Sequence, residues 1–274
     1  MRAVISKPLV LTIAISTVKG DFDGVLEYIV RVSNRLPRRV GFVIVSQLED
    51  VDRCYNETDS VKVVFSTQKG LSRSRNLAFD NCRATWVWFQ DGDICLIESR
   101  IEALINFLES SQFDIVLCQV GSLENKAENF KDYSRYSVSP TLLSFRISSI
   151  EIIARSAFLK NNKIKFDENL GLGTQLPSCE ENLFFYDAVV RNRARYGRYA
   201  TNVCLHTTMP ENRSIDYKRR YKARGYLLGR MRSIISPLVL AWWTIRNTGD
   251  GVSRVSRFSL MLQGYLRCIR RLQN

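Results

Sequence analysis

The tripeptide Asp91-Gly92-Asp93 is the clearest candidate for chemistry in this 274-residue sequence. It follows an aromatic and apolar run at residues 85–90, which is typical of a buried strand. Glycine lets the backbone turn tightly, so both carboxylates can approach one ion. Carboxylate oxygens suit Mg²⁺ or Mn²⁺, which commonly bridge protein carboxylates to substrate phosphates. The same tripeptide is common in plain turns, so the metal hypothesis depends on where this turn lies in the fold.

A second candidate is the segment Gly-Leu-Ser-Arg-Ser-Arg-Asn, which runs from Gly70 to Asn76. The residue pattern predicts a helix over residues 72–82. A helix N-terminus presents free backbone N–H groups, and Arg73 and Arg75 add positive charge. Together they are suited to a diphosphate or to the edge of a nucleotide base. An ordinary capped helix with exposed arginines is the alternative interpretation.

A third segment combines a flexible loop with paired carboxylates. Two glycines and a proline predict a loop over residues 171–177, and Glu180 and Glu181 then begin an apolar helix over residues 180–191. Acidic side chains in the first helical turn complement the helix dipole, which by itself explains both glutamates. The functional alternative is a general base with its orienting partner, because neighbouring carboxylates can differ widely in pKa.

These segments are set among alternating strand and helix patterns. Continuous β-branched and apolar runs predict buried strands, and apolar residues at helical spacing predict the helices between them. This alternation indicates an α/β fold with a doubly wound, mainly parallel sheet, whose ligands bind beyond the carboxyl ends of the strands. The predicted strands cover residues 8–16, 40–46, 61–66, 85–90 and 114–119, and the predicted helices cover residues 22–36, 72–82 and 98–110.

Polar residues at the ends of four strands should face one crevice. They are Ser16-Thr17, Ser46-Gln47, Ser66-Thr67 and Gln90-Asp91. This position places the Asp-Gly-Asp turn at the ligand-binding edge of the sheet, which favours a metal site over a plain turn. Residues 121–145 are polar and irregular, and we expect them to form a loop over the site.

The net charge of +13 is concentrated in the last third of the chain. Residues 191–274 hold 18 Lys and Arg against 3 Asp and Glu, whereas residues 1–190 hold 22 against 24. We expect a catalytic domain over residues 1–211 and a basic, amphipathic helical extension over residues 212–274. Arginines interleaved with Trp, Tyr and Leu favour contact between this extension and an anionic membrane surface. Packing of its apolar residues on the catalytic domain is the alternative.

Other bulk features limit the partners and the compartment. The basic charge is accompanied by no nucleic-acid-binding module, so we expect no nucleic acid as a partner. Seven scattered cysteines without a CxxC pair predict free thiols in a reducing compartment. No uncharged apolar run reaches the about 18–20 residues that span a bilayer, and residues 1–12 lack a signal-peptide cleavage site. These features favour a cytoplasmic protein attached peripherally to the inner face of the cell membrane.

Taken in order, the motifs resemble those of bacterial family 2 glycosyltransferases with the GT-A fold, which is a Rossmann-like α/β fold. The resemblance covers residues 8–210, about three quarters of the chain. It rests on five pieces: a strand ending at Ser16, Gly70-x-Ser-x-Ser-Arg75-Asn76, Trp-Phe-Gln-Asp91-Gly-Asp93, Gly-x-Gly followed by Cys-Glu-Glu-Asn-Leu-Phe, and Cys204-Leu-His206.

The resemblance implies a role for each matching residue. Asp91 and Asp93 look like the family's DxD metal motif, with Asp93 the more direct ligand. His206, which is the one histidine in the chain, looks like the histidine that binds the metal or the donor diphosphate. Glu180 and Glu181 resemble the acceptor motif, which places Glu181 at the catalytic base.

The resemblance also implies residues that contact the donor, and it shows where this sequence departs from the family's usual residues. Ser16, Arg75 and Gln47 are expected to contact the nucleotide, although relatives often carry an acidic residue where Gln47 stands. Glu181 replaces the family's usual aspartate, and Cys179 stands where many relatives have glycine. These departures keep open a catalytically inactive scaffold or nucleotide-sugar-binding subunit. A sugar nucleotidyltransferase is a further alternative, but Ser16-Thr-Val-Lys-Gly20 is a poor version of the Gly-rich loop that it needs.

The resulting expectation is an inverting glycosyltransferase that uses Mn²⁺ or Mg²⁺. A cation neutralises the departing nucleotide diphosphate, and one carboxylate removes the proton from the attacking hydroxyl. A single base and a direct displacement invert the anomeric centre. The resemblance implies a nucleotide-sugar donor, such as a UDP-sugar, and a saccharide or lipid-linked acceptor in bacterial surface polysaccharide synthesis.

Overall fold

The computed structural model describes residues 8–18, 20–47, 58, 60–93, 95–207, 216–246 and 249–273. Within these residues eight strands form one curled sheet in the order β3-β2-β1-β4-β7-β6-β8-β5. The strands are β1 (Leu11–Val18), β2 (Val40–Gln47), β3 (Val61–Ser66), β4 (Trp86–Asp91), β5 (Cys95–Leu96), β6 (Ile115–Ser122), β7 (Ile152–Arg155) and β8 (Tyr196–His206). The five predicted strands are therefore confirmed, with ends that shift by up to three residues.

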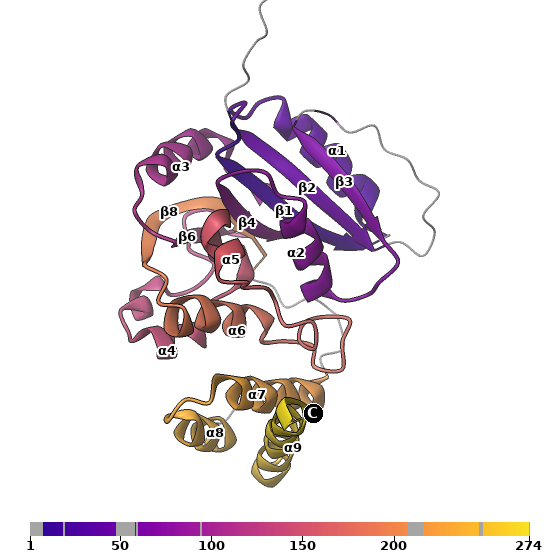
Figure 1. The fold of residues 1–274 in the computed structure, drawn as a ribbon, viewed down its shortest axis with the longest axis vertical. Coiled ribbons are helices and arrows are strands. Elements are labelled where there is room, and N and C mark those ends of the chain that lie inside the picture. Colours follow the sequence, from indigo (N-terminus) through magenta and orange to yellow (C-terminus); the bar gives the residue numbers. More distant parts are fainter. Residues whose placement is uncertain are drawn as a thin grey trace, which may run out of the picture.

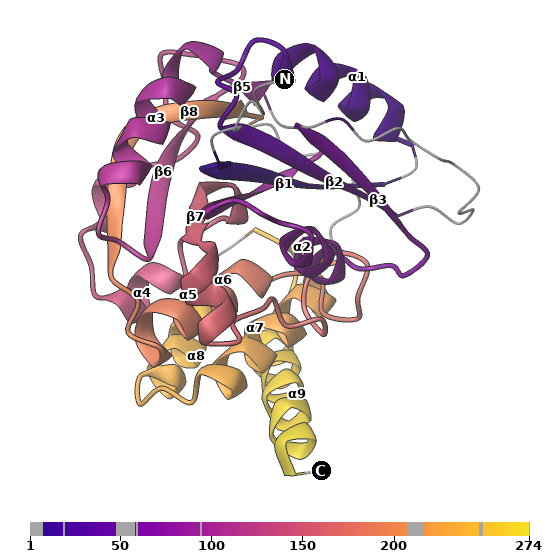
Figure 2. The ribbon, with the colours of Figure 1, turned by 45° about the horizontal axis from the view of Figure 1, so that its top comes forward.

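Helices cover both faces of the sheet, as Figures 1 and 2 show. Leu11 and Ile13 of β1 belong to the core cluster that includes α1 (Phe22–Ser33) and α3 (Glu98–Ser110). Ala14 belongs to the opposite cluster, together with residues of α2 (Leu71–Asp80), α5 (Ser156–Asn161) and α6 (Glu180–Tyr186). Because both faces of β1 are buried, its sequence is a continuous apolar run without polar alternation.

The order of the strands reverses beside β1. The chain runs outward from β1 to β2 and β3, then returns to place β4 on the other side of β1, and all these pairs are parallel. In open α/β sheets ligands bind at such a switch point. The register places Ser16 directly opposite Asp91, so two residues that are 75 positions apart meet at this edge.

The prediction of one irregular loop over residues 121–145 is wrong in part. Strand β6 continues to Ser122, a 3₁₀ turn covers Tyr133–Tyr136, and α4 covers Pro140–Ser144. These pieces form because Tyr133, Tyr136 and Leu143 are buried in the core. Strand β8 was not predicted, since its first half is polar and only its last residues are buried.

The helices of the C-terminal part of the chain form a separate layer beyond α6 (Figure 1). They are α7 (Tyr217–Met231), α8 (Ser236–Ile245) and α9 (Arg254–Gln273), the last of which projects away from the sheet (Figure 2). Helices α7 and α9 pack so closely that a Cβ at Gly225 would lie 1.8 Å from the Met261 carbonyl oxygen, and one at Gly264 would lie 2.0 Å from that of Lys222.

Apolar residues of this layer share a core cluster with Leu170, Leu176 and Leu183. Some apolar residues of the C-terminal helices, which the sequence analysis expected at a membrane surface, therefore pack on the sheet domain instead. The expected boundary at residue 211 lies outside the described residues. None of the described helices combines the length and the apolar character needed to cross a membrane.

Candidate active site

A crevice of about 1060 Å³ opens at the carboxyl edge of β1, β2 and β4. Strand-end residues line it as the sequence predicts, from Ser16-Thr17 through Gln47 to Asp91, Gly92 and Asp93. His206 also lines it. Ser66 and Thr67, which follow from the edge strand β3, are not among its described lining residues. The prediction that four strand ends face one crevice is therefore confirmed for three of them, those of β1, β2 and β4.

Ser16 and Gln47 occupy this crevice in different ways. The Ser16 Oγ is buried and has no hydrogen-bond partner among the described residues, so it can still bond a ligand. The Gln47 amide forms hydrogen bonds within the protein. Its Nε2 donates to Ser74 Oγ at 2.9 Å, and its Oε1 accepts from the Gly70 N–H at 2.9 Å. Gln47 thus joins β2 to the start of α2. Nucleotide contact by either residue stays a prediction.

The chain brings His206 to the Asp-Gly-Asp turn through β5. This short strand follows the turn and pairs with β8, with Cys95 opposite Leu205. As a result, His206 Nε2 lies 3.1 Å from Asp93 Oδ2, although the two residues are 113 positions apart. Burial lowers the pKa of His206, but the hydrogen bond to Asp93 and its charge outweigh burial and raise that pKa to about 9.

The residue types at this edge fit a hard divalent cation. Asp91, Asp93 and His206 offer carboxylate and imidazole donors at one end of the crevice. Within the described residues no three His, Cys, Asp or Glu side chains are gathered closely enough to form a complete protein cage. Mg²⁺ and Mn²⁺ sites that act on phosphates rarely need one, because one or two carboxylates share the ion with the substrate. Metal binding here stays a prediction.

Arg75 is placed differently from the sequence expectation. Its side chain is 1% exposed and does not line the crevice. The guanidinium instead donates to Asp91 Oδ1 at 2.7 Å, to Glu180 Oε1 at 3.0 Å and to Ser149 Oγ at 2.7 Å. Burial lowers the pKa of Arg75, but Asp91 and then Glu180 more than compensate, so the side chain stays charged. A buried cation needs such carboxylates, which explains why Arg75 faces the interior.

The other polar residues of the Gly70–Asn76 segment also hold structure together. Ser72 Oγ donates to the Leu170 carbonyl at 2.7 Å, and Asn76 exchanges hydrogen bonds with the backbone of Phe166. Arg73 forms an exposed ion pair with Glu168 at 3.0 Å. From the sequence, the arginines of this helix were expected to bind a diphosphate or the edge of a base. In the structure they have carboxylate partners, and the helix attaches the loop after residue 166 to the sheet.

Glu180 and Glu181 begin α6, as predicted, but they face different surroundings. Glu180 is buried against Arg75, whereas Glu181 is half-buried and lines a second cavity. Burial raises the pKa of Glu181 well above its usual value, and the charge of Glu180 raises it further. A carboxylate with a raised pKa beside an orienting partner is suited to general-base chemistry.

Cys179 occupies the N-cap of α6 with φ at 74°, in the left-handed region. Glycine adopts this conformation without a steric penalty, whereas other residues do not. A glycine in place of Cys179 would therefore adopt this backbone conformation without strain. The Cys179 side chain is buried among the apolar residues that join α6 to α7 and α8.

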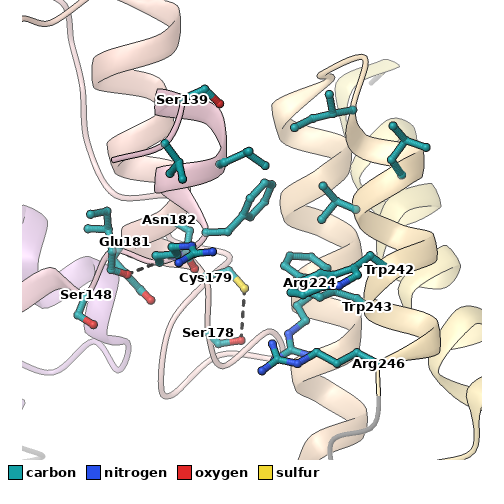
Figure 3. Close-up of a pocket in the computed structure, with 18 of the residues that line it drawn as sticks. Ser139, Ser148, Ser178, Cys179, Glu181, Asn182, Arg224, Trp242, Trp243 and Arg246 are labelled. Atoms are coloured by element: carbon teal, nitrogen blue, oxygen red, sulfur yellow. Dashed lines mark hydrogen bonds between the residues drawn. The ribbon is translucent and has the colours of Figure 1, made fainter. Parts of the chain in front are cut away.

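The second cavity also has a volume of about 1060 Å³ and lies between α6 and the C-terminal helices (Figure 3). Its walls include Ser148, Glu181, Arg224 and Trp243. Ser148 is held by a capping box, in which its N–H donates to Glu151 Oε2 at 2.7 Å. The next residue, Ser149, is the one that binds Arg75, so this turn touches both the buried arginine and the cavity.

Sequence reasoning missed Ser148, Ser149 and the arginines of the second cavity as site residues. The serines carry no local motif. The arginines were noted only as part of a basic extension, because a single sequence does not indicate which helix face meets Glu181.

Comparisons with known proteins bear on the fold and on the family. Residues 44–176 match the model of the family described as Glycosyl transferase family 2. No curated protein sequence matches the chain. Among solved structures, S. aureus TarS 1-349 in complex with UDP-GlcNAc aligns with a TM-score of 0.64 at 16% identity, over 95% of this chain and 79% of that one.

A second similar structure is the mannosyltransferase PcManGT from Pyrobaculum calidifontis in complex with GDP-Man and Mn²⁺. It aligns with a TM-score of 0.54 at 13% identity, over 98% of this chain and 76% of that one. At these low identities the structural likeness establishes the fold alone, which is the GT-A α/β fold that the sequence predicted. The segment that matches glycosyl transferase family 2 includes the Asp-Gly-Asp turn, and together the family match and the fold support a glycosyltransferase.

Proposed function

We propose that this chain is an inverting glycosyltransferase that takes a sugar from a nucleotide diphosphate donor, such as a UDP-sugar. The acceptor is a saccharide or a lipid-linked saccharide of bacterial surface polysaccharide synthesis, reached from the inner face of the membrane. The observation that carries the proposal is the Asp91–Arg75–Glu180 chain of ion pairs, at 2.7 and 3.0 Å. It connects the crevice of the Asp-Gly-Asp turn to the helix turn that presents Glu181.

The donor nucleotide is proposed to occupy the crevice. The unpartnered Ser16 Oγ is available to the nucleotide, and Asp91 and Asp93 lie where the diphosphate would end. Asp91, Asp93 and His206 would hold Mn²⁺ or Mg²⁺, which supplies positive charge for the departing diphosphate. The similar structures are complexes with UDP-GlcNAc and with GDP-Man, which is consistent with a nucleotide-sugar donor here.

Glu181 is proposed to act on the acceptor. It takes the proton of the acceptor hydroxyl while that oxygen forms a bond to the anomeric carbon and the bond from this carbon to the diphosphate oxygen breaks. The raised pKa of Glu181 makes the carboxylate a stronger base than an ordinary glutamate. Glu180 positions this turn through Arg75 and does not need to touch substrate. One displacement at the anomeric carbon inverts its configuration.

The test is release of UDP from UDP-sugars, or of GDP from GDP-sugars, by the full chain with Mn²⁺, compared with Asp93→Ala. We expect turnover by the wild type and a loss of about 10²–10³-fold in the variant, because charge on the leaving group is no longer stabilised. Asp80→Asn, which alters an exposed pair with Lys165, is the matched control. Wild-type protein that binds a nucleotide sugar without any turnover would indicate a scaffold. Pyrophosphate release from nucleoside triphosphates would indicate a nucleotidyltransferase.

A further inference from the structure

The second cavity has a cationic wall formed by arginines of the C-terminal helices. Arg220, Arg224 and Arg246 line it, and none of them forms an ion pair within the described residues. The Arg224 guanidinium lies 5.3 Å from the centre of the Trp243 ring, and that of Arg246 lies 5.2 Å from the centre of Trp242. Stacking on tryptophan holds a guanidinium plane and leaves its N–H edge available to an anion such as a phosphate.

The same cavity has an apolar wall that continues to the surface. Phe145 and Val239 line the cavity, together with Leu238, which is 72% exposed on α8. Ile234, two residues before α8, is 94% exposed, and Ile245, the last residue of α8, is 59% exposed. A group of large apolar side chains in water marks a surface that contacts something apolar. The apolar surface therefore runs outward from the cavity along α8.

The base proposed for catalysis faces this cavity from the opposite side. Figure 3 shows Glu181 and Asn182 on the α6 side, and Trp243 and Arg246 on the helices across from them. A ligand in this space would meet a carboxylate on the α6 side, and guanidinium groups and apolar side chains on the helices across from it. A neutral saccharide alone would leave the cationic and the apolar wall unused.

We propose that this cavity binds a lipid-linked acceptor through its phosphate or diphosphate group. The phosphate lies against Arg220, Arg224 and Arg246, the hydrocarbon chain leaves along α8, and the attached sugar presents its hydroxyl to Glu181. This inference rests on the proposed glycosyl transfer, and it narrows the acceptor from any saccharide to a phosphate-bearing lipid. Basic charge and exposed apolar residues then meet at the mouth of one cavity, where α8 contacts the membrane that carries the acceptor.

The test is calorimetric titration of the full chain with farnesyl diphosphate, below the concentration at which it forms micelles. Saturating UDP and EDTA are present, so the nucleotide crevice and its metal cannot bind the probe. We expect farnesyl diphosphate to bind at least about tenfold more tightly than inorganic pyrophosphate or farnesol. Tryptophan fluorescence should change on binding, because Trp242 and Trp243 stand at the site.

Two double variants identify the surface. Arg220→Ala with Arg246→Ala removes two exposed cavity arginines and should weaken binding at least about tenfold. Arg254→Ala with Arg267→Ala removes the same charge from exposed positions of α9 outside the cavity, and should leave affinity within about twofold. An equal loss in both variants would show general charge attraction and overturn the proposal. Equal binding of pyrophosphate or of farnesol would overturn the phosphate-lipid assignment.

The outcome can be separated from that of the proposed function. UDP release that depends on Asp93, without binding of farnesyl diphosphate, removes only the lipid-phosphate assignment. Binding of farnesyl diphosphate at the cavity arginines, without any sugar turnover, removes the acceptor role and the transferase together. The full proposal is supported if UDP release depends on Asp93, farnesyl diphosphate binds at the cavity arginines, and transfer is lost in the Arg220 and Arg246 double variant.

Discussion

The crevice and the second cavity have the same volume but are built differently. The crevice forms at one sheet edge from residues that directly follow strands, such as Ser16, Gln47 and Asp91. The second cavity forms between α6 and helices that lie 30–60 positions later in the chain. Its shape depends on how α7, α8 and α9 pack against one another. The first is therefore a property of the sheet, and the second is a property of helix packing.

Arg75 is the connection between these two regions, and its removal should give the largest effect. Arg75→Met leaves Asp91 and the buried Glu180 without their cation, which should lower the free energy of unfolding by about 3–5 kcal/mol. Urea unfolding measures this. The control is Arg73→Met on the same helix, where an exposed pair is worth about 0–1 kcal/mol. Similar losses in both variants would show that the buried connection has no special role.

Glu181→Gln tests whether the two regions perform different steps. Glutamine keeps the size but cannot take a proton, so we expect transfer to fall about 10²–10⁴-fold. Binding of UDP to the crevice, measured by calorimetry, should stay the same, since Glu181 lines only the second cavity. Asp93→Ala should instead impair the donor side. A loss of UDP affinity in Glu181→Gln would contradict this division.

Gly264→Ala tests the dependence of the second cavity on helix packing. The added methyl group meets the Lys222 carbonyl at about 2.0 Å, so α7 and α9 must move apart, at a cost of about 1–3 kcal/mol. We expect a lower midpoint of urea unfolding and weaker binding of farnesyl diphosphate, while UDP binding is kept. Gly24→Ala in α1, where a Cβ meets no atom within 4 Å, is the stability control and should not destabilise.

The smallest expected difference between the two regions is in their pH dependence: that of transfer should differ from that of UDP binding. Burial and Glu180 raise the pKa of Glu181, and the base acts only when deprotonated. Activity should therefore fall as the pH decreases through a value above the ordinary 4.5 of a glutamate, whereas UDP binding should not follow the same curve. A pH profile of kcat/KM measures this limb. If the residual activity of Glu181→Gln falls with decreasing pH in the same way as that of the wild type, the titrating group is not Glu181.

The sequence predicted the crevice better than the second cavity for a physical reason. Asp91 and Ser16 end strands whose apolar runs are visible locally, and parallel strands bring their carboxyl ends together. Arg75 shows the limit of this reasoning. Its position on a helix near the site suggested a phosphate ligand, but its orientation toward the interior depends on Glu180, which lies 105 positions away.

The sequence by itself determined the α/β fold, the sheet edge that holds the Asp-Gly-Asp turn, and the helix that begins with two glutamates. These features follow from periodicity and from turn residues, which act over a few positions of the chain. Only the tertiary structure decided that His206 meets Asp93, that Arg75 is buried between two carboxylates, and that Glu181 faces the arginines of the C-terminal helices. Such contacts depend on how strands and helices that form separately pack together, and no local pattern encodes that geometry.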